Sequence, residues 1–134
     1  MAKITGIGGV FIQSTKDSKA LSQWYAEHLG LKLEEYGHAA LEWRDDTAED
    51  GGLTVWCTAA PDSDWFAPSQ ASFMINYRID DMDGMLAQLE AGGVEIVKGP
   101  ESHENGRFLW VMDPEGNKIE LWEPKLWDEK NKEG

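Results

Sequence analysis

The chain has 134 residues, which suits one domain, and 41 % of them are hydrophobic, which is enough for a packed core. Its formal charge of −13 disfavours nucleic acid and anionic membranes as partners, because both are negatively charged. The acidic surface can serve solubility or attract a cationic ligand. No apolar run approaches the roughly 20 residues of a membrane span and no secretory leader is evident, so we expect a cytoplasmic protein.

The first residues predict a strand followed by a helix. Residues 4–13 alternate in the manner of a strand. Asp17 or Ser18 can cap the next helix, and Gly30 can end it in the left-handed conformation. The apolar side chains of this helix recur at helical spacing and are expected to face the core: Leu21, Trp24, Tyr25 and Leu29.

Three further strands are expected in the first half of the chain, followed by a linker. The alternating segments 31–36, 39–43 and 53–59 each suit a strand, and the polar segment 44–52 suits a loop. Residues 60–71 contain Pro61, Pro68 and several Asp and Ser residues, so they read as a linker between two halves. Trp65 and Phe66 can form a flap within it.

The second half repeats this order of elements. Residues 72–79 alternate strictly and predict a strand. Asp80 or Asp81 can cap a helix that ends at Gly92 and Gly93 and carries an apolar stripe of Met82, Met85, Leu86 and Leu89. The strands expected after it are 94–97, 107–112 and 118–122. Each half is therefore a strand, a helix and three strands, as a duplicated unit would be.

A hairpin joins the last two strands. Residues 113–117 read D-P-E-G-N, in which proline fixes φ at the second position while glycine and asparagine tolerate positive φ. In the second arm, Ile119 and Leu121 point to one face, and Lys118, Glu120 and Trp122 point to the other. A carboxylate is thus placed mid-strand between a lysine and a tryptophan.

Three motifs stand out: W-Y-x-x-x-L-G-L at residues 24–31, D-D-M-D-x-x-L-x-x-L-x-x-x-G-V at residues 80–94 and D-P-E-G-N-x-I-E-L at residues 113–121. Together they resemble the vicinal-oxygen-chelate superfamily, which includes glyoxalase I, bleomycin-resistance proteins and extradiol dioxygenases. The resemblance covers nearly the whole chain. It implies an α+β, glyoxalase-like fold in which two tandem βαβββ modules form a curved sheet around a trough.

This resemblance sets the expected domain organisation and assembly. One glyoxalase-like domain would contain module one at about 4–59, the linker at 60–71, module two at about 72–123 and a tail at 124–134. Family members commonly pair two chains, so a homodimer is expected, with Trp65, Phe66 or Trp127 as candidate interface residues.

The resemblance also implies where a divalent metal would be bound. Of the four family ligand positions, the one on the final strand corresponds to Glu120, which is a carboxylate. The others fall near Gly9, at Met74 and at Thr54 or Trp56, which are poor ligands for a hard cation. Because such sites normally need three protein ligands, no cofactor is predicted and a divalent metal is disfavoured. His38, His103 and Glu104 lie in turns, and their spacing matches no metal motif.

By alternation, a set of polar and aromatic side chains should line the trough around Glu120. Polar groups among aromatic walls are typical of a small-molecule pocket. Arg78 and Glu120 should come from neighbouring strands, where they could form a structural ion pair, contact a ligand directly, or do both. The candidate ligand-binding residues are Gln13, Trp56, Met74, Asn76, Arg78 and Trp122, joined by Trp43 and Trp110, whose facing the pattern leaves open.

Two functions follow from these residues. The first is a metal-independent binding protein of the bleomycin-resistance type, which would hold an aromatic or cationic compound through stacking and cation–π contacts. The alternative is a lyase, isomerase or dioxygenase of the same superfamily, with Glu120 as the catalytic base or as a metal ligand and Arg78 as the electrophilic partner.

Overall fold

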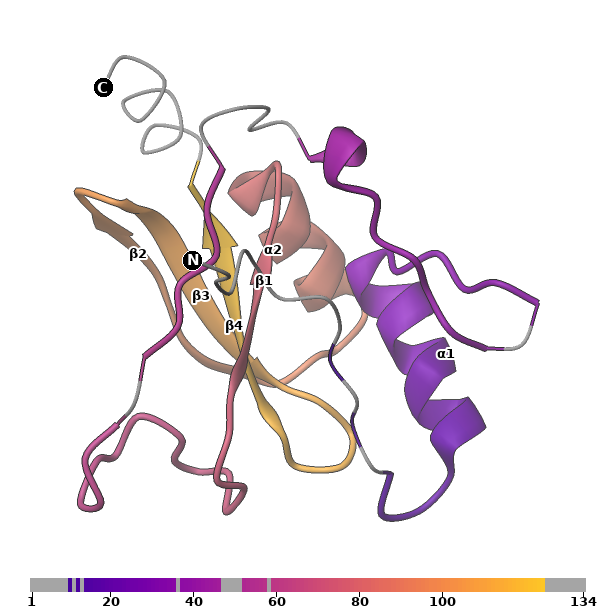
Figure 1. The fold of residues 1–134 in the computed structure, drawn as a ribbon, viewed down its shortest axis with the longest axis horizontal. Helices are drawn as coiled ribbons and strands as arrows, with labels where there is room; N and C mark the ends of the chain where they lie inside the picture. Colours follow the sequence, from indigo (N-terminus) through magenta and orange to yellow (C-terminus); the bar gives the residue numbers. More distant parts are fainter. Residues whose placement is uncertain are drawn as a thin grey trace, which may run out of the picture.

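A computed structural model of the protein describes residues 10, 12, 14–35, 37–46, 52–57 and 59–124 (Figure 1). Within them the elements are, in chain order, α1 (Ser18–Leu29), the 3₁₀ turn η1 (Trp43–Asp45), β1 (Ile75–Arg78), α2 (Met82–Ala91), β2 (Ile96–His103), β3 (Gly106–Met112) and β4 (Lys118–Glu123). The four strands form one sheet in the order β1-β4-β3-β2. β1 and β4 are parallel and the other pairs are antiparallel. The predicted α+β class is confirmed.

Both helices cover one face of this curved, unclosed sheet (Figure 1). The alternation of β3 and β4 sends their aliphatic side chains to that face, where burial of each contributes about 1.5–3 kcal/mol. The core cluster combines two side chains from each helix with four from the strands: Leu21, Tyr25, Met82, Leu89, Leu109, Val111, Ile119 and Leu121. The opposite face of the sheet is therefore left for polar and aromatic side chains.

The two helices begin and end as the sequence predicts. The Asp17 carboxylate accepts hydrogen bonds from the backbone N–H groups of Lys19 and Ala20 and caps α1. Gly30 ends α1 in the left-handed region, with φ of 74°. The Asp81 carboxylate caps α2 through the N–H of Gly84, and the helix ends at Gly92.

The elements of the second module are present in the predicted order. The prediction of strands at 31–36, 39–43 and 53–59 is wrong for the described residues of these segments. Those segments are extended or turning, with η1 in place of the end of the second one. Leu41 and Val55, at 69 % and 65 % exposure, leave the apolar faces of two of them uncovered. Alternation marks a segment that can be a strand, but a strand also needs a partner for its backbone hydrogen bonds. Among the described residues these segments have none in a sheet.

The last hairpin is built around the buried carboxylate of Asp113, which is only 5 % exposed. One oxygen accepts the N–H groups of Glu115 and Asn117, at 2.8 and 2.9 Å. The other accepts the Asn117 side-chain amide at 2.8 Å and the Tyr25 hydroxyl at 3.0 Å. Burial raises the pKa of Tyr25, so this hydroxyl stays protonated and able to donate. Asp113 thus fixes the turn and joins it to α1.

The same turn also holds the segment that enters α1. The Glu115 carboxylate accepts the Ser14 hydroxyl at 2.6 Å, and its other oxygen accepts the Thr15 N–H at 2.6 Å and the Thr15 hydroxyl at 3.0 Å. These hydrogen bonds lower the pKa of Glu115, chiefly through Ser14. The D-P-E-G-N turn therefore joins the two halves of the chain.

Among the helices in the described ranges, none is long and apolar enough to cross a membrane.

Replacing Tyr25 with phenylalanine should destabilise the protein by about 1–3 kcal/mol, because the buried Asp113 carboxylate loses one of its four donors. Urea unfolding of the variant measures this cost. The same substitution in an Asp113→Asn background serves as the control, because the hydrogen bond to an ionised carboxylate is already lost there. An equal cost in both backgrounds would show that the hydrogen bond to the Asp113 carboxylate is not responsible, because both variants lose only the hydroxyl and keep the ring.

Glu115 should make stability depend on pH in the acid range. Its folded-state pKa lies below the ordinary 4.5, so its contribution is complete above about pH 4.5 and is lost as the pH falls through the lowered value. The stability difference between the parent and Glu115→Gln should therefore shrink between neutral pH and about pH 3. Urea midpoints across this range measure it, and a pH-independent difference would contradict the role of the ionised carboxylate.

Candidate functional site

The face of the sheet that points away from the helices carries a row of aromatic side chains. β3 and β4 are aligned so that Trp110 is opposite Glu120 and Phe108 is opposite Trp122. Paired residues of neighbouring strands point to the same face, which resolves the direction of Trp110. Trp110, Phe108 and Trp122 form what we call the aromatic row. Their rings are nearly parallel, at 13° and 7°, with centroids about 6.0 and 5.9 Å apart.

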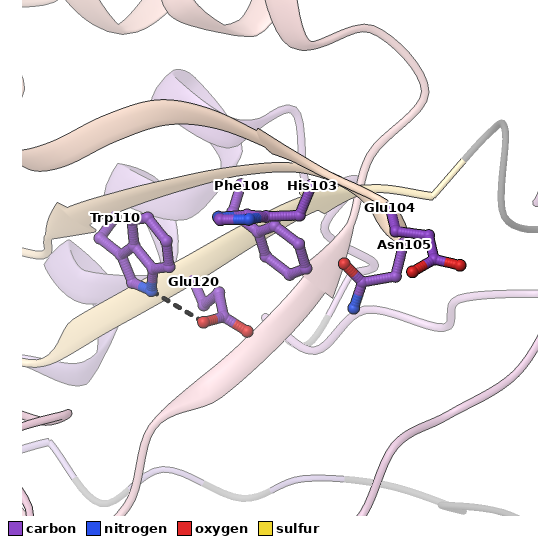
Figure 2. Close-up of a pocket in the computed structure, with 6 residues that line it drawn as sticks. All are labelled: His103, Glu104, Asn105, Phe108, Trp110 and Glu120. Atoms are coloured by element: carbon purple, nitrogen blue, oxygen red, sulfur yellow. Dashed lines mark hydrogen bonds between the residues drawn. The ribbon is translucent and has the colours of Figure 1, made fainter.

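Glu120 lies beside this row, with both oxygens engaged by N–H donors. The Trp110 indole N–H donates to one oxygen at 2.7 Å (Figure 2). The Asn76 side-chain amide donates to the other oxygen, also at 2.7 Å. Asn76 is placed there by the parallel pairing of β1 and β4, in which it is the partner of Glu120. Donors from two neighbouring strands therefore hold the carboxylate in one orientation, and each oxygen can still accept another hydrogen bond.

An open hollow of about 670 Å³ lies over these groups (Figure 2). Its wall combines ring surface with carboxylate and amide groups from β2, β3, β4 and the β2–β3 turn. The lining residues are His103, Glu104, Asn105, Phe108, Trp110 and Glu120. Trp122 lies beneath the surface at 4 % exposure, and its indole N–H donates to the Asn105 carbonyl at 2.8 Å. The aromatic row thus holds the β2–β3 turn through Trp122 and lines the hollow through Phe108 and Trp110.

Arg78 has a different partner from the one expected. Its guanidinium donates two hydrogen bonds to the Asp46 carboxylate, at 2.7 and 3.1 Å, and lies over the Trp122 ring, 5.6 Å from the centroid. The ion pair with Glu120, one of the two alternatives that the sequence left open, is therefore not formed. The reason is the register, because β4 places Asn76 opposite Glu120 and Arg78 opposite Trp122. A two-residue offset along a strand is enough to separate the two charges.

Three other predicted ligand-binding residues within the described ranges, Met74, Trp56 and Trp43, do not line this hollow. Met74 is half-buried just before β1. Trp56 is 79 % exposed, as is Trp43, which lines a second, more open hollow of about 530 Å³ with its neighbours on and around η1. Gln13 lies outside the described residues, as do Gly9 and Trp127. Their roles in binding remain predictions.

Sequence reasoning did not select four of the lining residues, namely His103, Glu104, Asn105 and Phe108. A signal for Phe108 was available, because it is two residues from Trp110 and must share its face within a strand. His103 and the turn residues Glu104 and Asn105 reach the hollow only because the β2–β3 hairpin folds back beside β4. The alternation of residues in the sequence does not predict how this hairpin packs.

The described residues do not fit the metal site that the superfamily implies. Within those ranges, no three His, Cys, Asp or Glu side chains gather in a group that could hold a metal ion. Glu120 is the one carboxylate at the family ligand positions, and it is held by two N–H donors. We therefore derive no chemical step through a metal.

Comparison with solved structures shows the fold over most of the chain. TnmS3, an antibiotic-binding protein from Streptomyces sp. CB03234, is 24 % identical and superposes over 90 % of this chain and 99 % of its own, with a TM-score of 0.53. VPC_CASS1, from the mobile metagenome of V. Pseudocholerae, is 20 % identical over 90 % and 95 % of the two chains, with a TM-score of 0.54.

Other superpositions cover a smaller part. A glyoxalase/bleomycin resistance protein from Streptomyces sp. CB03234 is 36 % identical over 39 % of this chain, with a TM-score of 0.36, and the match spans 46 % of that relative. The comparison with curated proteins finds no match. The family model named Glyoxalase/Bleomycin resistance protein/Dioxygenase superfamily matches residues 9–121, most of the sequence. The chain therefore belongs to this superfamily.

Proposed function

We propose that this protein binds a small aromatic cation, without a metal, in the hollow beside the aromatic row. The observation that carries the proposal is the position of Glu120, held by Asn76 and Trp110 at the wall of the hollow. A carboxylate fixed against ring surface can accept the positive group of a ligand while the flat part of that ligand contacts the rings. Cation–π contacts contribute about 0.5–2 kcal/mol, depending on desolvation.

The charge of the protein supports a cationic ligand. Glu104 adds a second carboxylate to the wall, and the chain as a whole carries a formal charge of −13. A negative field raises the local concentration of cations and repels anions. An anionic compound would therefore have to overcome both the local carboxylates and the field of the whole molecule.

One protein of the same fold supports a binding function. TnmS3 is described as an antibiotic-binding protein, and it shares the fold over 90 % of this chain. Antibiotics with flat ring systems and basic groups are among the compounds that a wall of aromatic rings and carboxylates would accept. The proposed ligand class rests on the hollow itself, and the relative adds only that a protein of this fold is described as binding an antibiotic.

The arrangement of charges favours binding over catalysis. A reaction that uses Glu120 as a base needs an electrophilic group to stabilise the charge that develops on the substrate. Arg78 was the expected group, but Asp46 and the Trp122 ring hold its guanidinium. Metal independence is proposed for the same site, because Glu120 is the one hard ligand among the described residues at the family positions.

Binding should be measured by calorimetry at pH 8 with N-methylacridinium, a permanent cation, and with neutral acridine, which has the same ring system. Trp110→Ala should weaken binding of both compounds by about tenfold, because it removes ring surface. Glu120→Gln should weaken binding of the cation by about tenfold and affect the neutral compound much less, because it removes the charge and keeps the size of the side chain and one acceptor oxygen.

Trp43→Ala and Trp56→Ala serve as matched tryptophan controls outside the hollow. Loss of binding in either of them, with parental affinity in Trp110→Ala, would place the site elsewhere. Prior dialysis against EDTA should leave the affinity unchanged. A dependence on added divalent metal would contradict the metal-free part of the proposal.

A further inference from the structure

The protein covers both ends of its aromatic row with cations of its own. At one end the Arg78 guanidinium lies 5.6 Å from the centroid of the Trp122 ring. At the other end the Lys98 ammonium lies 5.4 Å from the centroid of the Trp110 ring. Each cation is also paired with a carboxylate, Arg78 with Asp46 at 2.7 Å and Lys98 with Glu101 at 3.1 Å.

The two ends differ in exposure. The Arg78 side chain is 20 % exposed and lies against a buried tryptophan, so water and ligands have little access to that contact. The Lys98 side chain is 65 % exposed, and the tryptophan beneath it is part of the wall of the hollow. An exposed lysine ion pair contributes little to stability, about 0–1 kcal/mol. The contact at the Trp110 end can therefore be exchanged at low cost.

An irregularity in β2 brings Lys98 and Glu101 together. Residues three apart in a regular strand point to opposite faces, yet Lys98 is aligned with Trp110 and Glu101 with Phe108, two residues that share a face. The register shifts between Lys98 and Glu101, in the stretch that contains Gly99, whose φ is 96°. A side chain there would approach the Phe108 carbonyl to 2.8 Å, so glycine permits the bulge. The strand is thus shaped to hold Lys98 beside the row.

We propose that Lys98 is a displaceable cover of Trp110 that determines which ligands bind. This inference rests on the proposed function. A ligand that enters the hollow gains full use of the indole ring only by replacing the Lys98 ammonium over it. Lys98 does not line the hollow itself, so its departure would extend the available ring surface beyond the present wall. A flat cation makes the same contact as Lys98 with more area, whereas a small cation gains nothing from the exchange.

Displacement also releases an anionic group. Glu101 accepts Lys98 through one oxygen and contacts the His103 ring nitrogen through the other at 3.1 Å. Hydrogen bonding to Lys98, and then to His103, lowers the pKa of Glu101. Even without Lys98 the carboxylate stays ionised at pH 8, because its ordinary pKa is 4.5. Glu101 then becomes a further negative contact for the ligand, on β2, which is separated from the strand of Glu120 by β3.

The test uses N-methylacridinium binding to the parent and to Lys98→Ala, with folding checked by thermal melts. Removal of the cover should tighten binding by about two- to fivefold, the range of one exposed cation–π contact. Lys98→Arg keeps a cation over the ring and should not tighten it. Lys118→Ala is the charge-matched control, because Lys118 lies on the same face and interacts electrostatically with Lys98. Equal tightening in Lys98→Ala and Lys118→Ala would indicate simple charge repulsion and overturn the proposal.

A second readout needs no organic ligand. Quenching of Trp110 fluorescence by caesium ion, taken as the difference between each protein and its Trp110→Phe counterpart, should increase in Lys98→Ala by more than it does in Lys118→Ala. Unchanged quenching would overturn the proposal that Lys98 covers Trp110, even if N-methylacridinium binds to the parent. Increased quenching with no binding of acridinium by any variant would confirm the cover and would instead contradict the proposed function.

Discussion

The structure depends on one buried carboxylate. Asp113 accepts four hydrogen bonds, three from its own turn and one from Tyr25 of α1. Burial of a charge is costly unless it is paired or well hydrogen-bonded, so the turn can close around Asp113 only when all these donors are in place. This requirement fixes the loop length, and the loop length fixes the register of β3 and β4.

The register in turn determines both faces of the sheet. With Val111 opposite Ile119 and Leu109 opposite Leu121, the aliphatic side chains meet the helices. The same alignment places Trp110 opposite Glu120 on the other face. A shift of one residue would exchange the faces, burying the carboxylate and exposing the core. The hollow and the core are therefore two consequences of the same turn.

The sequence correctly predicted those features of the fold that depend on interactions between neighbouring residues. The helix caps at Asp17 and Asp81, the D-P-E-G-N turn and the facing of β4 follow from a few neighbouring residues, and the structure has them as expected. The partners of Glu120 could not be predicted in this way. They depend on how β1 aligns with β4 across a crossover, and that alignment selects Asn76 and sends Arg78 to Asp46. Likewise, the alternation in 53–59 indicated that this segment could form a strand, but it could not show whether a partner strand is present. The resemblance to the superfamily identified the fold, and the side chains around Glu120 had to come from the structure.

The most direct measurement is a nuclear magnetic resonance titration of the tryptophan indole N–H signals with N-methylacridinium. The signal of Trp110 can be assigned from Trp110→Phe, and its N–H donates to Glu120 at the wall of the hollow. A saturable shift of this signal, with the exposed Trp43 and Trp56 signals unmoved, is the result that binding beside Glu120 predicts. A shift of Trp43 or Trp56 alone, with Trp110 unchanged at saturation, would contradict it.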